Sequence, residues 1–201
     1  MPPEWTTIRD ELLAMAGHDL RVRSELAADG SLYDNYNERM QAVHDANAIR
    51  LAAILDAHGW PGEYRVGREA AKAAWLIVQH AIAQPPLQRR ALELLRQAVQ
   101  QGEAPALHAA MLEDRIRGLE GRPQLYGTQF DWDAEGNMTP LPLEDAKGVD
   151  TRRQAIGLGP LAQEVRARRA TITESLERPP RDWAKRQQEM QEWCRRVGWR
   201  T

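Results

Sequence analysis

Cysteine is almost absent from this sequence, which has a single residue of that type, Cys194. One cysteine can form neither an intrachain disulfide nor a metal site of several thiolates, and it fits a reducing compartment. The first residues, MPPEWTTIRDELLAMAG, also lack a basic leader and a continuous apolar run. We therefore expect no signal peptide and no spanning segment there, and a cytoplasmic protein. Cys194 itself is predicted to be a packed side chain of a terminal helix.

An excess of positive charge is lacking too. The formal net charge is -2, from 27 Lys and Arg against 29 Asp and Glu, so we expect neither nucleic acid nor a membrane as a partner. Residues 150–201 are locally basic, with 12 Arg or Lys against 7 Asp or Glu. We interpret this excess as a solvated helix surface, with an acidic partner as the alternative.

The signatures of several large enzyme classes are missing as well. The chain contains no GxSxG nucleophile elbow, no phosphate-binding GxxxxGKS/T loop and no dinucleotide-binding GxGxxG, which removes the usual support for those chemistries. It has no HExxH and no HxxxH pair either, so no metal ligand is assigned and the cofactor stays unknown. A composite metal site that joins His44, His80 and Glu113 or Asp114 is left open.

Apolar residues recur mostly at helical spacing, with Gly and Pro where helices begin and end. With 42% hydrophobic and 28% charged residues, the composition is that of a globular protein. We predict a mainly α fold, an orthogonal multi-helix domain over residues 1–177 with residues 178–201 appended as an amphipathic helix. About seven helices are expected, near residues 6–28, 35–58, 66–83, 85–102, 105–121, 150–177 (broken at 157–160) and 182–197.

The apolar side chains indicate which helix faces are buried. The helix over residues 66–83 carries the segment AAKAAWLIVQHAI, which is apolar nearly all round, so this helix is predicted to be the centre of the fold. The inward side chains of the first helix would be Ile8, Leu12, Met15 and Leu20. Those of the last helix would be Trp183, Met190, Trp193 and Val197.

Between residues 124 and 145 the pattern changes to QLYGTQFDWDAEGNMTPLPLED. Aromatic and Thr residues flank a polar turn at residues 133–137, so one small β-hairpin is predicted here. Pro140 and Pro142 cannot donate ladder hydrogen bonds, so the second arm is expected to be an edge or an extended strap.

Polar residues inside apolar helices are informative, because burying an amide or imidazole without a partner costs about 1 to 3 kcal/mol. Gln79 and His80 are adjacent within WLIVQHAI, so they project about 100° apart and at least one is expected to face the core or a cavity. The ordinary pKa of histidine is near neutrality, which suits His80 to general-base or ligand chemistry. The alternative is a structural histidine with satisfied hydrogen bonds.

On the second helix, His44 lies beside a stripe at three- and four-residue spacing that contains Met40, Val43, Asn47, Leu51, Ile54 and His58. His44 and His58 are about 21 Å apart along a straight helix, so they cannot share one metal ion. His58 is interpreted as a cap at the end of its helix, before the GWPG segment, with a ligand role as the alternative.

The fifth helix carries a charge on or beside its apolar face. Asp114 falls near the stripe of Leu107, Met111 and Leu119, and a carboxylate there needs a partner. Guanidinium groups could pair with it, or could instead hold an anionic ligand. The candidates are Arg115, Arg117, Arg152 and Arg153, and the ion pair is the favoured interpretation.

The segment from Tyr126 to Gln129 combines a phenol, a hydroxyl and an amide around Gly127, where backbone can approach closely. It is a candidate ligand-binding edge. Strand alternation would place Tyr126 and Thr128 on one face and Gly127 and Gln129 on the other, so all four converge only if the strand is bulged. The alternative is a hairpin that packs on the helices.

Several long motifs follow one another in a distinctive order, namely LDAHGWPG, VGREAAKAAWLIVQHA, LEDRIR, GRPQLYGTQFDWD, PLPLED and VDTRRQAIGLGPLAQ. Over residues 19–164, approximately, the sequence resembles the bacterial family catalogued as domain of unknown function 6624. The resemblance implies no known activity, substrate or catalytic residue. It implies that the family's motif positions are His58, Trp60, Pro61, Trp75, Gln79, His80, Asp114, Arg115, Tyr126, Gln129, Asp145, Arg152 and Arg153.

Our first hypothesis is a helical pocket that binds a small polar molecule or peptide, with hydrolysis as the candidate reaction. The catalytic assignments are His80 as general base, Arg115 for an anionic group or oxyanion, and Tyr126 to orient the substrate. The binding assignments are Gln79, Gln129, Arg152, Arg153, Asp114, Trp75, Trp60 and His58.

The second hypothesis is a protein-interaction module without catalysis. In it, the basic, Trp-containing segment 178–201 binds a partner protein or a second copy of the chain as a homo-oligomer. A third interpretation makes the polar residues a buried hydrogen-bond network that specifies the fold.

Overall fold

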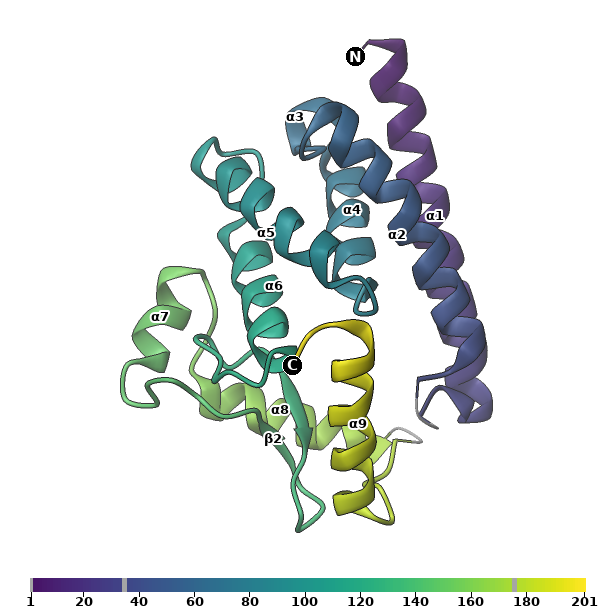
Figure 1. The fold of residues 1–201 in the computed structure, drawn as a ribbon. Coiled ribbons are helices and arrows are strands. Elements are labelled where there is room, and N and C mark those ends of the chain that lie inside the picture. The colour runs from purple at the N-terminus through teal and green to yellow at the C-terminus, as the bar shows by residue number, and fades with distance from the viewer. Residues whose placement is uncertain (1, 34–35, 175–176) are drawn as a thin grey trace. The chain divides into compact units, whose positions relative to one another are not determined.

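The computed structural model describes residues 2–33, 36–174 and 177–201 (Figure 1). These ranges contain nine α-helices and one small antiparallel hairpin, which confirms the predicted mainly α fold class. None of the helices described combines the length and the apolar character that crossing a membrane requires. The chain forms two compact units, Met1–Ala109 and Ala110–Thr201. The predicted status of residues 178–201 as an appendage to a domain over 1–177 stays a prediction.

The first unit is built on three long helices that pack against one another, α1 (Pro3–Asp29), α2 (Glu38–His58) and α4 (Arg68–His80). In Figure 1 the purple α1 and the blue α2 run side by side. The remaining elements are the 3-10 turn η1 (Ser31–Tyr33), α3 (Glu63–Val66), α5 (Pro85–Gln100) and the start of α6 (Ala106–Leu119). Helix α4 contacts α1, α2, α3 and α5, as expected for the helix predicted to lie at the centre.

Helix α2 has the ends that its sequence favours. Its N-cap is Asn37, whose side-chain oxygen accepts hydrogen bonds from the backbone N–H groups of Arg39 and Met40, a typical capping arrangement. The predicted start near residue 35 lies outside the described residues. The helix ends at His58, and Gly59 adopts a φ of 71°, which a residue with a side chain rarely adopts. The predicted stop at the HGWPG motif is confirmed.

The buried face of α1 differs from the prediction at one position. Ile8 and Leu12 are buried as predicted and Met15 is half-buried, but Leu20 is 51% exposed. The buried stripe passes instead through Asp19, which is fully buried. Consecutive residues project about 100° apart, and on α1 Asp19 points inward while Leu20 points toward solvent. The inward assignment of Leu20 is therefore wrong.

The helix predicted over residues 66–83 is present as α4, but it is shorter at both ends. Helix α3 ends at Val66, and α4 ends at His80. A turn follows, in which the backbone N–H of Gln84 donates to the carbonyl of Ala81. Pro85 disfavours helical backbone at the residue before it, and Gln84 has a φ of -122° and a ψ of 70°. His80 is the last residue of α4, and Ala81 is its C-cap.

The second unit contains the hairpin and three further helices, α7 (Val149–Ala155), α8 (Leu161–Glu174) and α9 (Trp183–Val197). Strands β1 (Phe130–Trp132) and β2 (Met138–Pro140) pair antiparallel. The Asp133 carboxylate closes the turn between them by accepting the N–H groups of Glu135 and Asn137. The break predicted at 157–160 is confirmed. Of the predicted helix that ends near residue 177, residues 175–176 lie outside the described ranges.

Helix α9 buries less of its surface than predicted. Trp183 and Met190 are 37% and 39% exposed, and the other two side chains predicted to be buried are only half-buried. The indole N–H of Trp183 donates to the backbone carbonyl of Trp132, so the tryptophan binds the hairpin through its polar edge. Cys194 is fully buried, as predicted for a packed side chain, and burial raises the pKa of its thiol.

Candidate functional site

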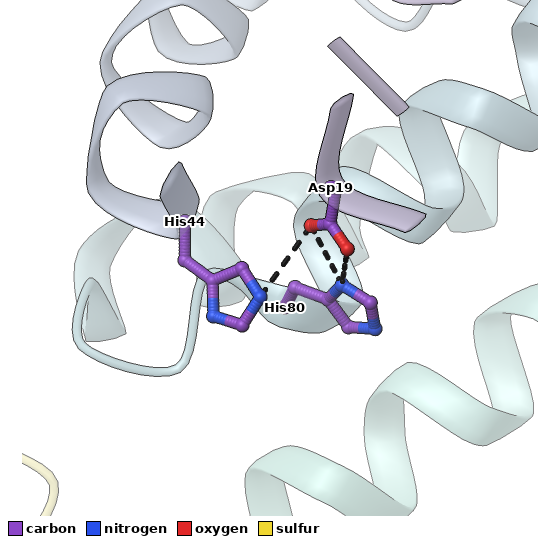
Figure 2. A group of neighbouring side chains, drawn as sticks. All are labelled: Asp19, His44 and His80. Carbon is purple, nitrogen blue, oxygen red and sulfur yellow. Dashed lines mark hydrogen bonds and ion pairs between the residues drawn. The ribbon is translucent and has the colours of Figure 1, made fainter. Parts of the chain in front are cut away.

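Three side chains from three helices of the first unit meet at one point (Figure 2). Asp19 comes from α1, His44 from α2 and His80 from the last residue of α4. One candidate ligand atom from each lies within 4.8 Å of the other two. In the ranges that the structure describes, no second group of three His, Cys, Asp or Glu side chains has this spacing. We call these three residues the Asp19 cluster.

Asp19 and His80 form a hydrogen-bonded pair. His80 Nδ1 lies 3.0 Å from Oδ1 and 2.9 Å from Oδ2 of Asp19. The Asp19 side chain is fully buried, whereas that of His80 is 19% exposed. Because an ionised carboxylate only accepts, Nδ1 carries the ring proton, and in the neutral ring Nε2 keeps its lone pair. The contact with Asp19 thus orients the ring so that Nε2 can act as a base.

His44 approaches the same carboxylate from α2. Its Nε2 lies 3.4 Å from Oδ2 of Asp19 but makes no hydrogen bond to any residue described. Burial, and secondly the neighbouring His80, lower the pKa of His44 to about 4, although the Asp19 carboxylate opposes this shift. His44 is therefore neutral at pH 7, and its contact with Asp19 is not an ion pair.

The other ring nitrogen of His44 contacts a phenol. Its Nδ1 lies 2.8 Å from the hydroxyl oxygen of Tyr36, and the two rings stack. Burial raises the pKa of Tyr36, and the carboxylates of Asp45 and Asp19 raise it further. The phenol therefore stays protonated at neutral pH, and it holds the His44 ring in one orientation.

The local sequence explains how each member reaches the cluster. Asp19 occupies the buried stripe of α1, and His44 is buried beside Val43 on α2. His80 ends α4 because the chain must turn before Pro85. A fully buried carboxylate costs several kcal/mol unless hydrogen bonds or opposite charges compensate. In this unit the Nδ1–H group of His80 provides that compensation.

Two further candidates lie on α4. Gln79 is buried, and its backbone carbonyl, like that of Val78, accepts the side-chain amide of Gln88. The indole N–H of Trp75 donates to the backbone carbonyl of His108, and the two rings stack at 4.4 Å. Gln88 and Trp75 thus connect α4 to the two helices that follow it.

The remaining candidates of the first unit flank the end of α2. Trp60 is buried. His58 is the last helical residue, as predicted, but its ring does not cap the last carbonyls. Its Nε2 lies 3.5 Å from the Glu4 carboxylate, and the ring packs edge-on against Trp5. The named contacts of His58 lie away from the Asp19 cluster.

In the second unit, Asp114 organises the segment between α6 and β1. Its fully buried carboxylate accepts hydrogen bonds from the backbone N–H groups of Leu125, Tyr126 and Thr128, and from the Thr128 hydroxyl. The expected direct ion pair with an arginine is therefore replaced by these hydrogen bonds, and Asp114 acts on Arg153 only through longer-range electrostatics. Backbone N–H groups satisfy the carboxylate because the loop folds around it.

The same loop explains why residues 125–129 do not form a strand. Gly127 has a φ of 67°, and a Cβ at this position would lie 2.8 Å from a methyl carbon of Leu161. The N–H of Gln129 donates to the Gln124 side chain, which donates back to the Gln129 carbonyl. The prediction of strand alternation over Tyr126 to Gln129 is therefore wrong, since the segment turns at Gly127.

Two arginines of α7 hold this loop. Arg153 is buried and donates to the backbone carbonyls of Tyr126, Gly127 and Gly159. Arg152 donates to the Leu125 carbonyl and to the Asp145 carboxylate. Arg152, followed by the Gly148 N–H group, lowers the pKa of the Asp145 carboxyl. An anionic ligand at Arg152 would have to displace these contacts.

A cavity of about 210 Å³ lies beside Arg153 in the second unit. Gln163, Glu164 and the apolar side chains of Leu158 and Pro160 also line it. Of the predicted ligand-binding residues, Arg153 alone is part of this lining.

The second unit thus gathers most of its predicted site residues around one loop. The hydrogen-bonded set comprises Asp114, Tyr126, Gln129, Arg152 and Arg153, while Arg115 lies on α6 next to Asp114. The hypothesised pocket would combine these residues with Gln79 and His80 of the first unit. That combination stays a prediction.

Sequence reasoning missed Asp19 and Tyr36. The signal for Asp19 was present, because an acidic residue stands seven residues after Leu12, on the same face of the helix. A pattern of apolar residues at helical spacing selects its neighbour Leu20 instead. No local pattern marks Tyr36, since its role depends on contact with His44.

Comparison with known proteins identifies a family and no characterised relative. A match to the family of unknown function (DUF6624) covers residues 6–173. It includes the range over which the sequence motifs show the resemblance and extends beyond it at both ends. No curated protein and no solved structure matches the chain.

Proposed function

Because the chain belongs to this family of unknown function, its activity must be inferred from its own site, and we propose that it is a hydrolase with His80 as general base. The observation that carries the proposal is the contact of both Asp19 oxygens with His80 Nδ1. A buried carboxylate in this position holds the imidazole in one tautomer and stabilises the imidazolium ion that forms during proton transfer.

In the proposed reaction, His80 Nε2 removes a proton from water while the water oxygen bonds to the electrophilic carbon of an ester or amide. The protonated ring then returns that proton to the leaving oxygen or nitrogen as its bond to the carbon breaks. Asp19 keeps its hydrogen bond to Nδ1 throughout and does not take the proton. The partial exposure of His80 supports this role, because a base must reach water or substrate.

His44 supports the same assignment. Its pKa of about 4 keeps it neutral, so it does not offer a second positive charge to Asp19. The carboxylate charge therefore remains available to the His80 imidazolium.

The ligand class in the proposal is a small polar molecule or peptide, and the location is the cytoplasm. Buried polar groups near the base, such as Gln79, support a polar ligand. The single, buried Cys194 supports a reducing compartment.

Substitution of His80 tests the base. We would compare wild type, His80→Gln and His18→Gln on chromogenic carboxylic esters and amides in the presence of a chelator. His18 is an exposed histidine next to Asp19 on α1, which makes it a matched control. His80→Gln should lower turnover about 10²- to 10⁴-fold, measured at a temperature at which circular dichroism shows the variant to be folded, and His18→Gln should not. Equal turnover by His80→Gln and wild type would overturn the proposal.

The tautomer of His80 gives a test that needs no substrate. Nitrogen-15 NMR of the histidine rings should show a protonated Nδ1 and an unprotonated Nε2 at neutral pH. A proton on Nε2 would leave no lone pair there to accept one from water, and would contradict the assignment.

The alternative, an interaction module formed by residues 178–201, has less support. Trp199 is buried, and Arg200 donates to the backbone carbonyls of Gly118 and Leu119. These anchor-type residues therefore stabilise the second unit itself. Removal of residues 178–201, followed by measurement of the mass in solution, tests whether the segment mediates self-association.

A further inference from the structure

The Asp19 cluster has the ligand set of a transition-metal site. Two imidazole nitrogens and a carboxylate oxygen suit divalent ions such as Zn²⁺. Two ligand atoms that each lie about 2.1 Å from one ion are about 3.0 Å apart when the ligand–metal–ligand angle is a right angle. They are about 3.4 Å apart when that angle is tetrahedral. Oδ2 of Asp19 lies 2.9 Å from His80 Nδ1 and 3.4 Å from His44 Nε2. These two separations match ligands that share one ion, and the two histidine nitrogens lie within 4.8 Å of each other.

His44 provides an independent observation. Its side chain is 9% exposed, and its Nε2 is directed at the Asp19 carboxylate (Figure 2). This nitrogen makes no hydrogen bond to any part of the chain that the structure describes. A buried polar atom without a partner costs about 1 to 3 kcal/mol. The hydrogen bond to Asp19 accounts for the position of His80, whereas a bound ion would account for that of His44.

Tyr36 completes the pattern. A histidine that binds a metal through Nε2 carries its proton on Nδ1 and usually donates it to an outer partner, which orients the ring. The hydroxyl oxygen of Tyr36 lies 2.8 Å from His44 Nδ1. The ring is thus already oriented with Nε2 toward Asp19.

We propose that Asp19, His44 and His80 bind one divalent transition-metal ion through Oδ2, Nε2 and Nδ1, respectively. The ion takes the place of the proton that His80 Nδ1 donates to Asp19. That proton moves to Nε2 of the same ring through solvent, so Nε2 loses its free lone pair. Metal binding therefore switches off the general base, and this consequence, unlike the binding itself, rests on the proposed function.

Zn²⁺ binding to the full chain tests the site. After removal of metal with EDTA and exchange of the buffer, wild type should bind one equivalent in a titration against a chromophoric chelator. His44→Ala and His80→Ala should each lower the affinity at least about 100-fold, and Tyr36→Phe about 10-fold. His18→Ala, the exposed control, should bind as wild type does. Failure of wild type to bind Zn²⁺ more tightly than His44→Ala would overturn the site.

A second measurement avoids variants that fail to fold. One equivalent of Co²⁺ added to wild type should produce visible absorption bands of an ion with nitrogen and oxygen ligands, and one equivalent of Zn²⁺ should remove them. A spectrum equal to that of Co²⁺ in buffer would overturn the site, whatever the variants do. Circular dichroism of each variant shows whether its helices remain folded.

The two proposals can fail separately. Turnover by chelator-treated protein that depends on His80, with no Zn²⁺ binding, would overturn the metal site alone. Zn²⁺ binding that depends on His44, with turnover unchanged in His80→Gln, would overturn the general base alone.

Discussion

Asp19 and His80 are 61 residues apart in the sequence, yet both carboxylate oxygens of Asp19 lie within 3.0 Å of His80 Nδ1. The pair joins the middle of α1 to the C-terminal end of α4. Well-packed apolar side chains of similar volume often stabilise a folded protein as well as a buried charged pair does. We therefore interpret the buried carboxylate as serving chemistry more than stability.

Replacement of Asp19 by Asn should lower hydrolysis about 10⁴-fold, because the amide no longer selects the productive tautomer of His80. The measurement is kcat/KM together with the nitrogen-15 shifts of the His80 ring. Asp10→Asn, which changes an exposed carboxylate on the same helix, should have no effect. Loss of activity with an unchanged tautomer would contradict the orienting role of Asp19.

Stability should depend on pH through His44. Its pKa is lowered from 6.5 to about 4 in the folded protein, so between these values the unfolded chain binds a proton that the folded chain excludes. The contribution of His44 to the free energy of unfolding is thus fully present above pH 6.5. It is lost as the pH falls toward 4, by at most about 3 kcal/mol.

Urea unfolding of metal-free protein at several pH values measures this effect. The difference in unfolding free energy between wild type and His44→Gln should change between pH 6.5 and pH 4. A difference that is constant over this interval would show that His44 is not held neutral by burial.

The two leucines of α1 should respond differently to truncation. Leu12→Ala should cost about 2 to 5 kcal/mol, because this side chain is fully buried. Leu20→Ala should change stability by less than about 0.5 kcal/mol, because Leu20 is half exposed. Thermal or urea unfolding measures both, and equal losses would contradict the inward position of Asp19.

Removal of the Asp114 carboxylate should destabilise the second unit by at least about 3 kcal/mol, because several buried donors lose their acceptor. Hydrogen exchange of the backbone amides of Leu125, Tyr126 and Thr128 in Asp114→Ala should become faster. Thr128→Val removes only one of these hydrogen bonds and should cost about 1 kcal/mol. Unchanged amide exchange in Asp114→Ala would show that the loop is held by other contacts.

Local signals were sufficient to predict where most helices end. The stop after His58 depends on Gly59, and the start of α5 depends on Pro85, so each follows from backbone preferences within a few residues. The hairpin turn could be predicted for the same reason, because Asp133 satisfies the turn through its own neighbours. His80 could be singled out as a candidate in the same way, since a histidine interrupts an apolar run.

Side-chain partners were predicted less well. Charge complementarity predicts an arginine opposite Asp114. In the fold, backbone N–H groups donate hydrogen bonds to the Asp114 carboxylate instead. Trp183 was expected in the core for its hydrophobicity, although its helix packs on a small hairpin and leaves part of the ring exposed. In both cases the partner comes from a distant segment that the local pattern does not specify.

The amino-acid sequence determined the helical character of this protein and the family to which it belongs, and it singled out His80 as a candidate. Periodicity and capping are local properties of the chain, so they can be read without knowledge of the fold. Only the tertiary structure showed that Asp19 is the partner of His80 and that His44 shares this carboxylate. That meeting depends on how α1, α2 and α4 pack, because it brings together atoms from residues that are 25 to 61 positions apart in the sequence.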